Sequence, residues 1–83
     1  MQRELRCALD TAYARLKDAE ATPTAFAGNY ALGLGIVVGA QACGGMTDAE
    51  AACERARFAM LAIVYEARER VRSNISTRND QTQ

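Results

Sequence analysis

One segment of this chain, from Ala21 to Thr47, contains no charged residue, although 24% of the whole sequence is charged. Its centre reads YALGLGIVVGAQACGG, in which glycines alternate with leucine, isoleucine and valine. A soluble chain cannot leave such a segment in water without cost. It could hold a phosphate with its glycines, cross a membrane, or form a helix packed closely against other protein, and each alternative predicts different flanking residues.

The phosphate-binding alternative rests on Gly33, Gly35 and Gly39, which approximate a dinucleotide-binding fingerprint. That fingerprint functions between a strand and a helix, within a unit of about thirty residues. Here a helical pattern and Pro23 precede it, and no second strand follows. We therefore expect neither nucleotide nor any other cofactor.

The membrane alternative rests on residues 25–43, an uncharged run close to the minimum length of a transmembrane helix. Asn29 and Gln41 near its ends and the glycines lower its hydropathy, and no Lys or Arg flanks it as an anchor. A membrane-spanning or holin-like protein is the less favoured alternative.

Close helix packing is the favoured interpretation, in a helix from Pro23 to Cys43. Thr22 is a suitable N-cap before Pro23, and Gly44-Gly45 suits the helix end. Small residues at every fourth position form a row on which another helix could approach closely: Ala27, Ala31, Gly35, Gly39 and Cys43. A short strand or irregular loop over LGLGIVV remains the alternative.

Two further helices flank this segment. Residues 2–20 are amphipathic, with Leu5, Leu9, Ala12 and Leu16 on one face. The third helix is expected over 48–73, because Thr47 and Glu50 form a capping box. We expect its core stripe to be Cys53, Ala56, Met60, Ile63, Ala67 and Val71, with Phe58, Leu61 and Tyr65 as a second apolar set.

These elements predict an all-α fold: one three-helix domain over 1–73 and a polar, disordered tail over 74–83. Helices two and three form a hairpin, and helix one packs across it. The second helix and residues 58–65 of the third are apolar on all sides, which one copy cannot cover, so a homodimer is expected. A permanent hetero-partner would serve equally well. The residues expected in dimer contacts or packing are Ala31, Gly35, Gly39, Phe58, Leu61 and Tyr65.

The residue inventory argues against catalysis. The chain has no histidine, which excludes histidine-dependent nucleophile pairs and triads. Cys7, Cys43 and Cys53 lack the spacing of a zinc site, so we expect no metal. An odd cysteine count indicates reduced thiols, and we expect these to be buried in a cytoplasmic protein. The charged N-terminal MQRELRCALD does not resemble a secretion signal.

The expected function is a non-enzymatic protein-interaction module, of inhibitor, adaptor or co-chaperone type, that occupies a surface on a larger protein. Its small size and alanine content give the impression of an accessory protein of a phage or mobile element. The expected partner-binding face is on helix one and comprises Arg6, Asp10, Tyr13 and Lys17, and the alternative for Tyr13 is a place at the edge of the core. The rival class is a nucleic-acid-binding regulator that uses Arg68, Arg70, Arg72 and Arg78, although the net charge is zero.

Overall fold

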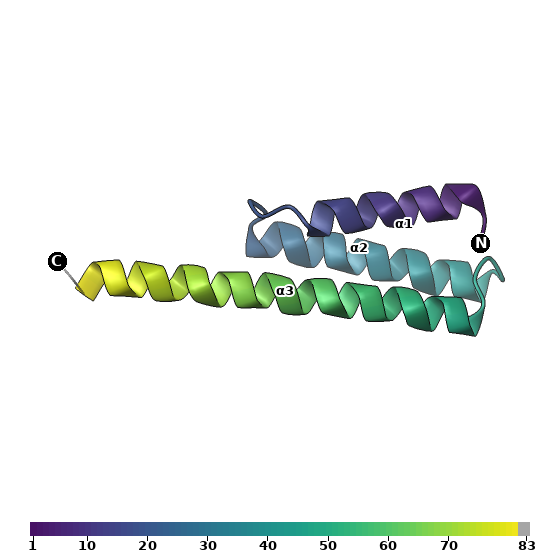
Figure 1. Ribbon diagram of the computed structural model, residues 1–83. Coiled ribbons are helices and arrows are strands. Elements are labelled where there is room, and N and C mark those ends of the chain that lie inside the picture. The colour runs from purple at the N-terminus through teal and green to yellow at the C-terminus, as the bar shows by residue number, and fades with distance from the viewer. Residues whose placement is uncertain (82–83) are drawn as a thin grey trace.

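Three helices follow one another along the chain in the computed structural model, which describes residues 1–81 and the side chains as far as Ile75. They are α1 (Arg3–Leu16), α2 (Pro23–Ala42) and α3 (Asp48–Gln81). Each runs antiparallel to the one before it, and α3 extends well beyond the other two (Figure 1). Residues 1–81 contain no strand, so the predicted all-α class is confirmed.

The predicted helix starts are confirmed by their capping hydrogen bonds. At α2, the Thr22 Oγ1 accepts from the Ala25 N–H at 3.1 Å, and Pro23 takes the first helical position. At α3, the Thr47 N–H donates to Glu50 Oε1 at 2.9 Å and the Glu50 N–H donates to Thr47 Oγ1 at 3.1 Å. These bonds satisfy amide groups that a helix start leaves without partners.

The helix ends differ more from the prediction. Gly44 has a φ of +76°, the left-handed conformation that ends α2 as expected. α1 ends at Leu16 rather than near residue 20, because the Asp18 side chain accepts from the Glu20 N–H at 2.9 Å and forms a turn. α3 continues to Gln81, beyond the expected end at Ser73. The predicted disorder over 74–83 stays a prediction, and residues 82–83 lie outside the described part.

The core lies where the three helices meet, and four of its side chains are almost fully enclosed: Leu9, Leu16, Val37 and Phe58. Aromatic rings from all three helices join it. The Tyr13 and Phe58 ring centroids lie 4.7 Å apart, and those of Phe26 and Tyr65 lie 4.0 Å apart in a stacked pair. Leu9, Ala12 and Leu16 of the predicted α1 stripe are buried as expected.

The predicted core stripe of α3 is wrong. Met60 and Ile63 are 61% and 57% exposed, whereas Phe58 is fully buried and Tyr65 is 7% exposed. The set expected as secondary therefore faces inward. Both sets have helical spacing on opposite sides of one helix, and the face with the larger aromatic surface gains more by burial.

The expected tight packing along the small-residue row of α2 is also wrong within one chain. A side chain at Gly35 or Gly39 would meet nothing within 4 Å, and the whole row is exposed. Gly33 makes the close contact instead, because a Cβ there would overlap the Phe58 ring. The expected burial of the cysteines is a further error, since all three are exposed free thiols: Cys7, Cys43 and Cys53.

Candidate interaction surfaces

The partner-binding face predicted on α1 is divided by the structure. Asp10 and Lys17 are exposed, but Tyr13 is 3% exposed and lies in the core. Its hydroxyl donates to Glu54 Oε1 at 2.6 Å, across to α3. Arg6 is half-buried and pairs with the same carboxylate. Tyr13 and Arg6 therefore join α1 to α3, and the prediction of a continuous outer face is wrong.

Glu54 is the centre of this contact and the one buried acidic side chain among the described residues, with 6% exposure. Arg6 donates to it through two guanidinium nitrogens, Nη2 to Oε1 at 3.0 Å and Nη1 to Oε2 at 3.3 Å. The Arg57 guanidinium lies 4.4 Å from the centroid of the Tyr13 ring. Such a bidentate, charge-assisted arrangement fixes the relative position of two helices.

The network shifts the protonation of its members. The hydrogen bond from Arg6 holds the pKa of Glu54 below its ordinary range, despite the opposing effect of burial. Burial and then the hydrogen bond to Glu54 raise the pKa of Tyr13 to about 12. Both shifts keep the network in one state near neutral pH, a carboxylate that accepts from a neutral phenol. A fixed protonation state of this kind is typical of a contact that holds two helices together.

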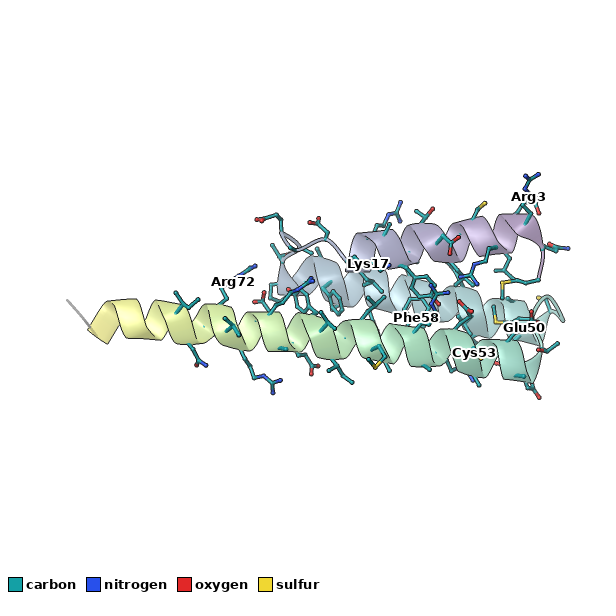
Figure 2. The ribbon with its side chains drawn as sticks, viewed as in Figure 1. Arg3, Lys17, Glu50, Cys53, Phe58 and Arg72 are labelled. Atoms are coloured by element: carbon teal, nitrogen blue, oxygen red, sulfur yellow. The ribbon has the colours of Figure 1, made fainter. Side chains whose placement is uncertain are left out.

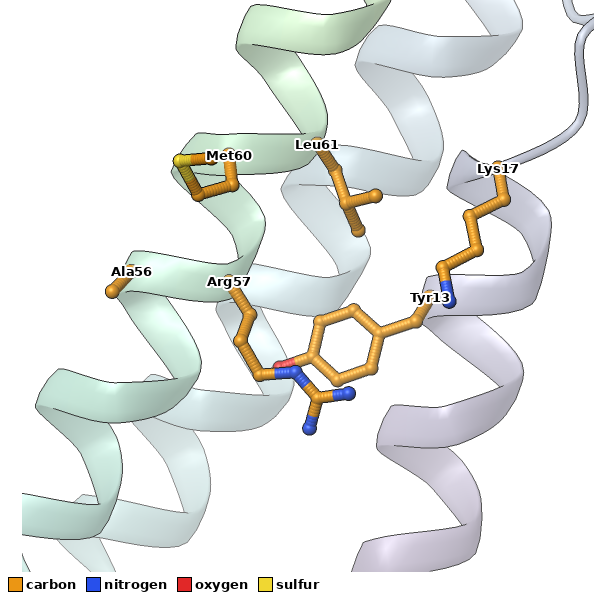
Figure 3. Close-up of a pocket in the computed structure, with 6 residues that line it drawn as sticks. All are labelled: Tyr13, Lys17, Ala56, Arg57, Met60 and Leu61. Carbon is orange, nitrogen blue, oxygen red and sulfur yellow. The ribbon is translucent and has the colours of Figure 1, made fainter.

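A shallow groove of about 320 Å³ lies beside this network, between α1 and α3 (Figure 3). Figure 3 shows Arg57 reaching toward Tyr13 from α3, with Lys17 at the opposite edge. The rest of the lining is Ala56, Met60 and Leu61. No cysteine, serine or threonine lines it, and the described residues contain no group of three side chains suited to a metal. The groove combines apolar side chains with two cationic ones, those of Lys17 and Arg57.

The residues expected in dimer contacts fall into two groups. Phe58 and Tyr65 are buried inside the chain and offer no free face to a partner, whereas Leu61 is partly buried and lines the groove between α1 and α3. Tyr65 also donates a hydrogen bond to the Ala21 carbonyl at 3.0 Å. The small residues of α2 remain exposed: Ala31, Gly35 and Gly39. They lie on an uncharged face with Leu32 and Val38, which are 65% and 56% exposed.

A second apolar surface runs along α3, on the side directly opposite the core. At about 100° per residue, six uncharged residues share this side. We call them the outer stripe: Ala49, Cys53, Ala56, Met60, Ile63 and Ala67. Exposed Val64 and Val71 flank it. Figure 2 shows Cys53 and Phe58 on this helix, with Phe58 pointing into the bundle. Sequence analysis found most of the stripe but assigned it to the core.

Among the C-terminal arginines, Arg72 already has partners within its own chain. Arg72 donates to the Ala19 carbonyl at 3.1 Å and pairs with Glu69 at 3.3 Å. Arg68 and Arg70 are exposed, and the side chain of Arg78 lies outside the described residues.

In residues 1–81 one helix, α2, is long and apolar enough to cross a membrane, with 17% of its most apolar stretch buried. This is weak evidence, because the core helix of a soluble bundle can have the same length and composition. No known protein family, curated protein or solved structure matches the chain. The exposed faces of α2 and α3 are the candidate functional surfaces, because they leave large apolar side chains in water.

Proposed function

We propose that this chain is a small, non-enzymatic protein-interaction module that works in an assembled form, at least as a homodimer. The observation that carries the proposal is the outer stripe of α3, an apolar surface that its own chain leaves in water. Met60 and Ile63 are more than half exposed on it, and burying side chains of this size stabilises a complex by about 1.5–3 kcal/mol each.

The proposal includes a larger protein as the target, in the manner of an inhibitor, adaptor or co-chaperone. The uncharged face of α2 leaves a second surface for that target. Free thiols at Cys7, Cys43 and Cys53 fit a reducing, cytoplasmic setting. A nucleic-acid role has less support, because Arg72 already binds a carbonyl and a carboxylate of its own chain.

Contact with a membrane is the second candidate, and the length and composition of α2 favour it. The two candidates predict different behaviour. An interaction module associates in plain buffer, whereas a membrane protein requires lipid or detergent to keep α2 from aggregating.

Sedimentation equilibrium of the full chain tests the proposal, with vesicle flotation as the second arm. We expect a mass near twice 9.0 kDa at tens of micromolar protein, and no flotation with phosphatidylcholine or phosphatidylglycerol vesicles. A single-chain mass over the whole range would overturn the proposed assembly. Flotation with both kinds of vesicle would favour the membrane candidate instead.

A further inference from the structure

We infer that the outer stripe of α3 is a self-association surface, on which a second copy of this chain packs its own α3 in antiparallel orientation. This inference rests on the proposed assembly and names its surface and geometry. Four observations carry it: the periodicity of the stripe, the sizes of its side chains, the distribution of charge along it, and the hollows at its two ends.

The periodicity of the stripe is that of a helix pair. Its members follow one another at alternating intervals of four and three residues, from Ala49 to Ala67. That spacing keeps one seam of a helix facing a neighbouring helix over several turns. The inner face of α3 already packs Phe58 and Tyr65 into the core. Packing within one chain therefore does not require the same spacing on the outer face.

Side-chain size favours the antiparallel orientation. When two stripes run antiparallel about a point between Ala56 and Met60, Met60 meets Ala56 of the second copy and Ile63 meets its Cys53. Every layer then pairs a larger with a smaller side chain, or two alanines. A parallel pair would place Met60 against Met60 and Ala56 against Ala56, which alternates crowded and empty layers. Interdigitation of large and small side chains packs without voids.

Charge along α3 favours the same orientation. Asp48 and Glu50 flank the start of the stripe, and Arg68 and Arg70 flank its end together with one acid, Glu66, which leaves that end net positive. In the antiparallel pair Glu50 comes within about one turn of Arg68 of the second copy, on the same flank, and Asp48 approaches its Arg70 on the other flank. A parallel pair would bring acid to acid and base to base. Arg57, close to the seam, is turned away toward the Tyr13 ring.

Two hollows lie at the ends of the stripe. The one at the start of α3, about 410 Å³, is lined by residues that include Ala49, Glu50 and Cys53. The other, about 450 Å³, is lined by Ile63, Val64, Ala67, Arg68 and Val71. The antiparallel register brings the first hollow, whose acidic and basic groups balance, onto the second hollow of the other copy, which carries Arg68. The seam spans about 27 Å, so its area falls below the roughly 1,600 Å² of a standard interface, and we expect micromolar affinity.

Cysteine cross-linking of the full chain tests the geometry, in a background in which Cys7→Ser and Cys43→Ser leave only Cys53. Adding Ile63→Cys places two thiols that face each other across the antiparallel seam. They cannot bond within one chain, because ten residues of helix separate them by about 15 Å, whereas bonded cysteines need Cα atoms at about 6 Å. Ala14→Cys, exposed on α1, is the matched control for random collisions.

After copper-catalysed oxidation at tens of micromolar protein, we expect the Ile63→Cys chain to form roughly tenfold more covalent dimer than the Cys53-only chain or the control. Efficient cross-linking of Cys53 alone would show a parallel pair and overturn the inference. Cross-linking at the control level, in a chain that sedimentation still shows as a dimer, would assign the dimer to another face.

A second variant keeps the test independent of engineered thiols. Ile63→Glu places a charge in the seam while leaving the core untouched, so we expect an unchanged helical circular dichroism spectrum and a single-chain mass. A dimer of unaltered affinity would overturn the inference. If the unmodified chain is itself a monomer, the proposed assembly fails together with the inference, whereas the three contrary outcomes above affect the inference alone.

Discussion

The inner and outer faces of α3 differ less in apolar character than in the size and shape of their side chains. The inner face presents Phe58 and Tyr65, whose rings pack against those of Tyr13 and Phe26 from the other two helices. The outer face presents Met60 and Ile63 with alanines on both sides of them along the stripe. Large rings fill the space where three helices meet, whereas a low surface of small and medium side chains suits one neighbouring helix. The spacing of apolar residues alone does not predict which side of a helix is buried.

Truncating one side chain on each face of α3 should give the largest difference in the free energy of unfolding, because only the inner face stabilises the single chain. Phe58→Ala removes a fully buried ring and should lower the free energy of unfolding by about 3–5 kcal/mol. Met60→Ala, on the outer face, should change it by less than about 0.5 kcal/mol at submicromolar concentration, where the copies separate. Urea unfolding followed by circular dichroism measures both. Equal losses at the two positions would show that the faces are assigned wrongly.

Loss of the Glu54 carboxylate should have the next largest effect, because Arg6 and Tyr13 both bind it. We expect Glu54→Ala to cost about 2–3 kcal/mol of unfolding free energy. Glu66→Ala, at an exposed position on the same helix, is the matched control and should cost almost nothing. A loss at position 54 no larger than at position 66 would contradict the network.

The same network predicts a dependence of stability on pH. The pKa of Glu54 is lowered in the folded state, so its contribution is present above the ordinary pKa of a glutamate and is lost as pH falls through the folded value. The pKa of Tyr13 is raised to about 12, so its contribution is present below about 10 and is lost between about pH 10 and 12. Urea midpoints across pH should fall at both extremes in the natural chain, and Tyr13→Phe should remove much of the alkaline fall.

Substituting the glycines of α2 by alanine should change the free energy of unfolding least, but with opposite signs at two nearby positions. Gly33→Ala would push a methyl group into the Phe58 ring, and we expect a net loss of about 1–2 kcal/mol after the gain in helix propensity. Gly35→Ala meets open space and should gain about 0.5–1 kcal/mol. Thermal unfolding of the two variants at low concentration checks this. A loss at Gly35 as large as at Gly33 would mean that the row is packed.

Local signals in the sequence were enough to predict the helices. Thr22 with Pro23 and Thr47 with Glu50 act through bonds between residues three apart, so their geometry depends little on the rest of the fold. The first-helix stripe was equally clear, because charged residues occupy its other sides. In α2 no charge separates the apolar faces around Gly33, and in α3 residues 58–65 are uncharged on every side, so orientation could not be read from periodicity.

The interior junction of Arg6, Tyr13 and Glu54 was missed for a different reason. Each residue is of a type usually found at the surface, and they meet only because α1 and α3 lie side by side. One signal was available. Glu54 lies one turn before Phe58, on the same face, so a buried Phe58 implies a shielded carboxylate that needs partners. Neither arginine nor tyrosine could be chosen as that partner without the helix packing.

The hydrogen bonds that Tyr65 and Arg72 make to the loop between α1 and α2 affect the order in which the chain folds. They reach carbonyls at Ala21 and Ala19, 44 and 53 residues earlier in the sequence. Loop closure over such separations is entropically expensive, whereas α1 and α2 are neighbours joined by a short turn. The first two helices should therefore meet early, and the far half of α3 should dock after the rate-limiting step. Substitutions at Tyr65 would then speed unfolding and leave the folding rate almost unchanged.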